Sequence, residues 1–351
     1  MRGRPPRRAG VRRVLRFGAL VLSCLVRAAA AAADVEQALA FVGLSADAAS
    51  RIRGGDIVLT DVAPASSHEL AIGLAFLVER PLADVSADYR AALDMHVDAQ
   101  VRALARVHGT LADFAGVALP ADEAARYLAA RPGDQLNLSA DEIAAFQAAA
   151  AAGGNAHARA QQVLAQVLFE RYRAYAAHGL DALAPYARAG GDVRRPSEEL
   201  RAALAAGVLL RRYAPPVWQM LGAYPQGKPA NLDERFYVVT YELNDRPNYA
   251  LRHRLEVPFG DGGIVVVDRD FYVSHGYNTS QAVSGLIPVA EGTMVFYRDR
   301  VSTDQLRGFG SSLKQAVGRR VMASRLTAIL QRSRACFQAA TMCPLAAASP
   351  G

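Results

Sequence analysis

The chain has 351 residues, of which 52% are hydrophobic and 21% charged, and its formal net charge is +7. This composition is typical of a globular protein with a real core, and the length suits one large domain or two ordinary ones. Residues 1–33 hold eight arginines and no acid, so subtracting these eight charges from +7 leaves −1 for the rest. A nearly neutral body has no global field that attracts phosphate backbones, which excludes a nucleic-acid partner.

The first 33 residues predict a cleavable secretory signal peptide. A basic region ends at Arg16, an apolar run covers residues 17–26, and alanines at 28–33 offer cleavage sites. The run is shorter than the roughly 20 residues that span a bilayer, and no later apolar stretch reaches that length. We therefore expect no transmembrane anchor and a periplasmic or secreted protein that begins near Asp34. A lipoprotein-type site at Cys24 and a twin-arginine route through Arg12 and Arg13 are alternatives.

The next segment mixes strands and helices. Residues 54–62 and 67–78 read as two strands around a turn at Pro64, because β-branched and apolar residues are bounded by turn residues. Residues 81–107 read as a helix from their apolar spacing, although the end of this segment, residues 100–108, also alternates as a strand does.

Alanine-rich helices dominate the middle of the chain. Their capping residues, acidic first turns and stopping residues predict helices within 119–134, 138–154, 157–179 and 195–221. The predicted organisation is a signal peptide (1–33), an N-terminal α+β part (34–149), a helical insertion (150–225), an antiparallel meander with a closing helix (226–335) and a C-terminal tail (336–351).

The last third predicts an antiparallel meander followed by one long helix. Five candidate strands are joined by short turns rich in Gly, Pro, Asn and Asp; they cover 233–243, 250–259, 263–278, 280–290 and 292–301. A capping box begins a helix at 303–331. Its apolar residues are expected to form one stripe, made of Leu306, Phe309, Leu313, Val317, Val321 and Ile329. The predicted fold class is α+β, an antiparallel sheet with a long C-terminal helix plus an inserted helical subdomain.

Two resemblances follow from these elements. The strands "DIVLTDV" and "ELAIGLAFLVE", the helix "RPLADVSADYRAAL", the late meander and the closing helix resemble the START-like, or helix-grip, arrangement. That resemblance implies a sheet wrapped around the last helix with an apolar cavity between them. The stretches "RPGD", "FYVSHGYN", "GTMVFYRDR" and "GFGSSLKQAVGRR" are also similar to exported bacterial proteins of unknown function, which supply no activity.

The stretch "DRDFYVSHGYNTSQAVSG" is the candidate wall of that cavity. In a strand, alternate residues share a face, so one face would carry Phe271, Val273, His275 and Tyr277. We expect these four side chains to face Leu306, Phe309, Gly310, Leu313 and Val317 of the closing helix, around an apolar or amphipathic small molecule or a lipid. The alternative for His275 is a sheet histidine bonded to a neighbouring backbone.

Catalytic and metal patterns are weaker. No G-x-S-x-G motif is present, and the seven histidines show no zinc-ligand spacing, so the sequence indicates no metal and no cofactor. Acids and arginines alternate at 268–270 and 297–300, which predicts cross-strand ion pairs. Cys336 and Cys343 are expected to form a disulfide. Two alternatives to a binding protein stay open, a hydrolase-like enzyme that uses His275 as acid and base, and a structural or protein-interaction module.

Overall fold

The computed structural model describes residues 35–133, 135–260, 262–306 and 311–339, which all belong to one compact unit. The predicted signal peptide lies outside the described residues. Within them, every helix is too short or too polar to cross a bilayer.

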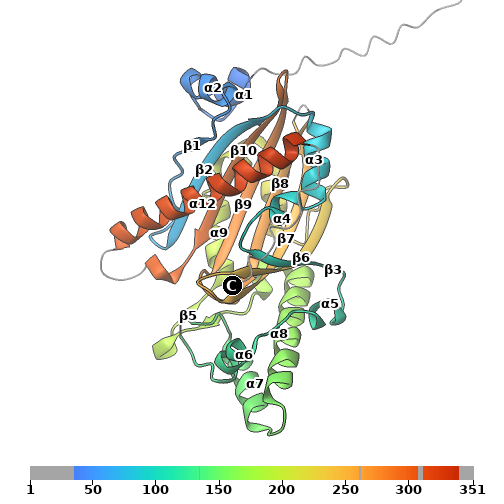
Figure 1. Cartoon of the computed structure of the whole chain (residues 1–351), viewed down its shortest axis with the longest axis vertical. Coiled ribbons are helices and arrows are strands. Elements are labelled where there is room, and N and C mark those ends of the chain that lie inside the picture. Colours follow the sequence, from blue (N-terminus) through green and yellow to red (C-terminus); the bar gives the residue numbers. More distant parts are fainter. Residues whose placement is uncertain (1–34, 134, 261, 307–310, 340–351) are drawn as a thin grey trace, which may run out of the picture. The chain divides into compact units, whose positions relative to one another are not determined.

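An eight-stranded antiparallel sheet is the centre of the fold (Figure 1). Its strands run in the order β1-β2-β10-β9-β8-β7-β6-β3, and each pair of neighbours is antiparallel. The strands are β1 (Val58–Thr60), β2 (Glu69–Val78), β3 (Val101–Val107), β6 (Asp233–Glu242), β7 (Pro247–Phe259), β8 (Gly263–Val273), β9 (Thr279–Val289) and β10 (Gly292–Ser302). The predicted α+β class, the five-strand meander and its antiparallel pairing are confirmed.

Tight turns set the register of the meander. Asn244 and Asp245 have φ values of 53° and 57°, as both central residues of a type I′ hairpin turn require. The flanking Leu243 and Arg246 exchange backbone hydrogen bonds of 2.8 and 3.2 Å. This turn pairs Glu242 with Pro247 and thereby fixes which side chains of β6 and β7 lie opposite each other. The short loops of the meander therefore decide which residues meet on each face of the sheet.

The helix α12 (Ser311–Ala339) lies across one face of this sheet (Figure 1). Its buried residues Leu326 and Leu330 pack in one core cluster with strand residues such as Phe76. Gly318 allows a close approach, because a Cβ added there would lie 3.0 Å from Leu70 Cδ2 on β2. The same side of the sheet carries α3 (Leu82–Arg90) and α4 (Leu93–His96), whose packing completes the layer.

The predicted apolar stripe of α12 is wrong. Leu313, Val317 and Val321 are 71%, 56% and 64% exposed, so the sheet lies against a different face of the helix. The reason is geometric: a helix has 3.6 residues per turn, so each step of four residues rotates the side chain by about 40°. Four such steps place Ile329 nearly opposite Leu313. The face toward the sheet instead carries Gly318, Met322 and Leu326.

The opposite face of the sheet is covered by helices inserted between β3 and β6. They are α5 (Ala112–Ala115), α6 (Ala121–Leu128), α7 (Ala140–Ala151), α8 (Ala156–His178), α9 (Pro196–Ala205), α10 (Val208–Tyr213) and α11 (Pro215–Ala223), with a small hairpin of β4 (Tyr186–Ala187) and β5 (Val193–Arg194). One core cluster joins them to sheet residues such as Leu251, Leu255 and Val267. The helical part is thus longer than the predicted insertion of residues 150–225. Residues 101–107, for which the sequence left a helix end and a strand open, form the strand β3, which pairs with β6.

The remaining helices lie near one end of the sheet. These are α1 (Val35–Phe41) and α2 (Ala46–Arg53), and their buried residues Leu39 and Ile52 pack with Leu77 and Met294 of β2 and β10. Ser45 caps α2 by accepting a hydrogen bond from the backbone of Ala48. The segment that follows the predicted cleavage point is therefore part of the folded unit.

Candidate functional site

A cavity of about 450 Å³ lies between α12 and the sheet, and we call it the α12 cavity. Six sheet strands (β3, β6, β7, β8, β9 and β10), the β2 residue Leu70, the α3 residue Tyr89, the α4 region and α12 contribute side chains to it. The cavity occupies the place that the resemblance implied, between the sheet and the closing helix. A volume of this size is within the range of drug-sized ligand pockets.

Strand registers bring the polar lining together. Ala282 of β9 is paired with Asp268 of β8 on one side and with Asp299 of β10 on the other. Ser280 is likewise paired with Asp270. Since residues directly opposite in a sheet point to the same face, these side chains all project toward α12, and all of them line the cavity.

Two of these aspartates form cross-strand ion pairs with β7, which confirms the predicted pairing for residues 268–270. Arg252 donates to both oxygens of Asp270, at 2.7 and 2.9 Å. Tyr277 donates a third hydrogen bond to Asp270 at 2.9 Å. Arg254 pairs in the same way with Asp268, at 2.8 and 2.6 Å. These carboxylates are therefore neutralised within the sheet.

Asp299 differs from its neighbours, because it has no arginine partner within the described residues. Its side chain is 7% exposed, and the hydroxyl of Ser280 donates a hydrogen bond to it at 2.9 Å. Burial raises the pKa of Asp299 to about 6, with the hydrogen bond from Ser280 opposing this shift and the charge of Asp270 adding to it. A nearly buried carboxylate without a cation is costly unless something that enters the cavity meets it.

Two more buried polar atoms in the lining lack a hydrogen-bond partner within the described part of the chain. These atoms are Gln100 Oε1 and Arg325 Nε. Arg325 reaches from α12 to Asp98 at 2.8 Å through a different nitrogen, so its Nε–H is left over. Buried polar atoms in native proteins are nearly always satisfied. Unsatisfied atoms of both kinds, acceptor and donor, therefore indicate a wet or ligand-filled cavity.

The rest of the lining is apolar or aromatic, which makes the cavity amphipathic. Leu70, Met95, Met322 and Leu326 are among the apolar side chains. Four tyrosines also line it: Tyr89, Tyr241, Tyr277 and Tyr297. Burial raises the pKa of Tyr297 and of Tyr277 well above the ordinary value, so both phenols stay protonated.

Few of the sequence-predicted site residues line the α12 cavity. Tyr277 does. Leu306 is buried at the end of a short 3₁₀ turn, Asp304–Leu306, whereas Leu313 and Val317 are exposed on α12. Phe309 and Gly310 lie outside the described residues. Val273 is fully buried in a cluster with Met95 and Tyr241, directly beneath residues that do line the cavity.

Phe271 faces the opposite side of the sheet from the one predicted. Its ring stacks on Tyr175 of α8, with centroids 4.1 Å apart. A β-bulge explains the difference: Leu251 pairs with Tyr272 and Arg252 with Asp270, so Phe271 is an extra residue in β8. One extra residue breaks the alternation of faces. Phe271 therefore lies on the side of α8, whereas Val273 and Tyr277 lie on the other side, with Met95 of α4.

His275 is held by backbone. One ring nitrogen lies 3.1 Å from the carbonyl oxygen of Pro247 on the neighbouring strand, and burial lowers the pKa of the imidazole. Within the described residues His275 does not line the α12 cavity. Its geometry is that of the alternative stated above, a sheet histidine bonded to a neighbouring backbone.

A buried histidine network on the other face of the sheet was not predicted from the sequence. His253 lies 3.0 Å from Tyr175 Oη through Nδ1 and 3.0 Å from Glu234 Oε1 through Nε2. Burial lowers the pKa of His253 to about 4, although the bond to Glu234 opposes this. The ring is 0% exposed, so the network joins α8 to the sheet rather than facing a substrate.

No set of three His, Cys, Asp or Glu side chains suited to a metal ion occurs in the residues that the structure describes. Cys336 is disulfide-bonded; because Cys343 lies outside the described residues, the predicted pairing stays a prediction. No family model, no curated protein and no solved structure matches the chain.

Proposed function

We propose that this protein binds an amphipathic small molecule in the α12 cavity, and that the head group of this ligand donates hydrogen bonds to Asp299. The observation that carries the proposal is the buried carboxylate of Asp299, which lines a cavity of about 450 Å³ without a cationic partner in the described chain. The START-like, helix-grip resemblance supports it, because a cavity under the closing helix is what that arrangement implies. An exported location, as the N-terminal sequence predicts, belongs to the same proposal.

The charge of the lining favours a cationic head group, such as an amine. Five aspartates line the cavity: Asp94, Asp98, Asp268, Asp270 and Asp299. Three arginines pair with four of them: Arg254 is shared between Asp94 and Asp268, Arg252 pairs with Asp270 and Arg325 pairs with Asp98. The lining is therefore net negative, and its tyrosine rings add a surface that attracts cations. The apolar side chains of α12 and α4 would hold a hydrocarbon body.

The hydrolase-like alternative has less support, because it relies on His275. One nitrogen of that ring is hydrogen-bonded to the carbonyl oxygen of Pro247. Within the described residues, the ring does not line the cavity. The protein-interaction alternative does not explain the unsatisfied polar atoms of the lining, which face a cavity and not an outer surface.

The test compares three ligands of equal length, octylamine, octan-1-ol and octanoate, by isothermal titration calorimetry on the folded protein. We expect octylamine to bind one per molecule and most tightly. Asp299→Asn should weaken octylamine binding about tenfold or more, as loss of a charged hydrogen bond does. The matched control is Asp192→Asn, which changes an exposed aspartate far along the chain from the lining residues. Equal binding of amine and alcohol, unaffected by Asp299→Asn, would refute the role of Asp299, and binding of none of the three would refute the site.

A further inference from the structure

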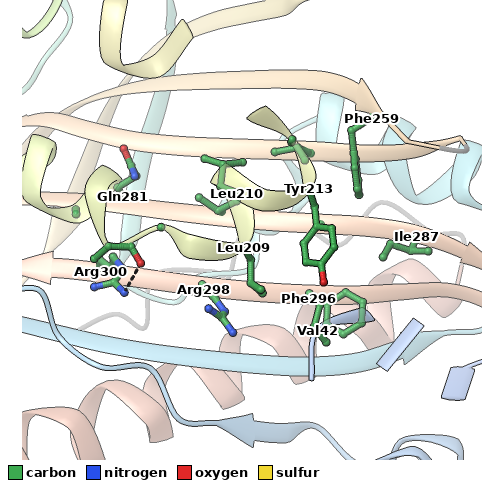
Figure 2. A pocket seen from close by; sticks show the side chains of 17 residues that line it. Val42, Leu209, Leu210, Tyr213, Phe259, Gln281, Ile287, Phe296, Arg298 and Arg300 are labelled. Atoms are coloured by element: carbon green, nitrogen blue, oxygen red, sulfur yellow. Dashed lines mark hydrogen bonds between the residues drawn. The ribbon is translucent and has the colours of Figure 1, made fainter. Parts of the chain in front are cut away.

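A second cavity, of about 90 Å³, lies on the other face of the sheet, and we call it the α10 cavity. Its floor is made by strands β8, β9 and β10, and α9 and α10 cover it. Figure 2 shows Leu209 and Tyr213 of α10 above the strand that carries Phe296 and Arg298. The α10 cavity shares no lining residue with the α12 cavity.

Most of the walls are apolar. They include Leu209, Leu210, Phe259, Val283, Ile287 and Phe296. Gln281 and Arg300 add polar groups, but both are occupied by neighbours. The side-chain oxygen of Gln281 accepts hydrogen bonds from Arg269 at 2.7 and 3.1 Å. Arg300 donates to Glu69 at 2.6 Å and to the carbonyl oxygen of Ala206 at 3.2 Å, the contact drawn in Figure 2.

Arg298 differs from Gln281 and Arg300, because its side chain takes part in none of these contacts. Its guanidinium has neither an ion pair nor a hydrogen bond within the described residues, although it is half-buried in the cavity wall. Burial and the neighbouring charge of Arg300 both lower its pKa. A guanidinium presents a planar fork of donors that matches a carboxylate, and two parallel charged hydrogen bonds form when they meet. An apolar cavity with an unpaired arginine in its wall is thus suited to an anion that has a hydrocarbon body.

We propose that the α10 cavity is a second ligand site, which binds a short-chain carboxylate through an ion pair with Arg298. The size of the cavity sets the length of the ligand. A cavity of about 150 Å³ accepts benzene, so about 90 Å³ suits a body of about four carbons. Butanoate and its branched relatives are the class that fits. This site does not depend on the function proposed for the α12 cavity. The two cavities have different lining residues, and the charged group that would bind the ligand is Arg298 here and Asp299 there.

The experiment is a titration of the ¹⁵N- and ¹³C-methyl-labelled protein with butanoate, followed by NMR. Saturable shifts are expected at Leu209, Val283 and Ile287, whose methyl groups line the cavity. Butan-1-ol, the neutral counterpart, and butylamine, the cationic one, should bind about tenfold or more weakly than butanoate. Octanoate should bind no more tightly than butanoate, because its longer body exceeds the cavity.

Three variants act on the site in different ways. Arg298→Gln removes the charge and should weaken butanoate binding about tenfold or more, while Arg298→Lys keeps the charge and should recover part of it. Gly285→Val fills the cavity from β9: a Cβ added at Gly285 meets only Phe296 Cβ, at 4.0 Å, so the side chain enters free space. It should abolish the saturable shifts while the protein stays folded.

The matched control is Arg106→Gln, which makes the same change at an exposed strand position of β3. It should leave butanoate binding unchanged. The proposal is overturned if butan-1-ol binds as well as butanoate, if Arg106→Gln and Arg298→Gln have equal effects, or if butanoate produces no saturable shift at the three methyl-bearing residues. If Arg298→Gln does not fold, Arg298→Lys and Gly285→Val are compared with the native protein instead. The proposal is then overturned if neither variant weakens butanoate binding.

Discussion

Arg298 and Asp299 are consecutive residues of β10 whose side chains line cavities on opposite faces of the sheet. Alternation along a strand imposes this separation. Neither side chain has an ion-pair partner within the described residues, although the surrounding arginines and aspartates of the sheet are paired. The two proposed sites can therefore be tested by substitutions at adjacent positions. Arg298→Gln removes a positive charge from one site, and Asp299→Asn removes a negative charge from the other.

Asp299→Asn should stabilise the protein at neutral pH. Because burial raises the pKa of Asp299 from 3.8 to about 6, the native state holds more protons than the unfolded state between these values. Stability then falls as the pH rises through this window, and the cost, of the order of 3 kcal/mol, is complete above about pH 6. The asparagine variant avoids that cost and still accepts the hydrogen bond from Ser280. Urea denaturation at several pH values measures the difference.

The gain from Asp299→Asn should disappear below about pH 4, where the carboxyl is protonated in both states. Asp270, Arg252 and Arg325 also bear on Asp299, but they are the same in both proteins. Burial also raises the pKa of Glu199, to about 7. Glu199 is likewise present in both proteins, so its contribution to the pH dependence cancels. The difference between the two proteins therefore isolates Asp299, and a gain that does not change with pH would contradict the prediction.

Ala282→Phe should fill the α12 cavity with a small effect on folding. Ala282 lies between Asp268 and Asp299 in the sheet and lines the cavity, so the ring has free space. The control is Ala250→Phe on β7, where the alanine is 0% exposed and packed among side chains. Overpacking of this kind costs about 1–3 kcal/mol or more. Thermal unfolding and octylamine binding together distinguish the two variants. Ala282→Phe should lose octylamine binding, whereas Ala250→Phe should lower the thermal stability.

His253 should remain neutral in the folded protein down to about pH 4. Burial lowers its pKa to about that value, so between pH 4 and 6.5 the unfolded state binds more protons and stability rises with pH. An NMR titration of the imidazole nitrogens measures the pKa directly. A midpoint near 6.5 would show that the ring reaches solvent and that its contacts with Tyr175 and Glu234 are open.

Export should remove the arginine-rich N-terminus. The prediction is a mature chain that begins near Asp34, because the alanines before it suit cleavage. Intact-mass analysis of the protein from an exporting bacterium gives the cleavage point, and the same spectrum without reductant reports whether Cys336 and Cys343 are joined. A folded protein that keeps Arg2 to Arg16 would contradict export, and two alkylated thiols would contradict the pairing.

Local signals predicted much of the fold. The turn at Asn244 and Asp245 is visible as two residues that tolerate positive φ, and such turns predicted the antiparallel meander. Residues 101–107 were ambiguous because a short apolar pattern fits a helix and a strand, and the pairing with β6 decided it. The face that α12 buries was missed because steps of four residues were treated as one stripe.

The site was harder to predict, because it depends on registers across several strands. The bulge at Phe271 results from how β7 and β8 pair, and no local residue pattern marks it. Asp299 was noticed only as part of an alternating run and was expected to form an ion pair. Its lack of a partner follows from its place in the row: Ala282 and Ile72 lie opposite Asp299 on its two neighbouring strands, and the arginine of that row, Arg254, lies opposite Asp268. Aligning β8, β9 and β10 from their tight turns would have found this row.

The two outer strands of the sheet have a consequence for self-association. An exposed strand edge is a template on which a strand of another molecule can pair, and short or charged edges oppose this. At one edge, β1 has only three residues. At the other, β3 carries exposed Arg102 and Arg106 and a register irregularity after Val101. Both edges of the sheet therefore resist the addition of strands, which opposes β-aggregation between copies of this chain.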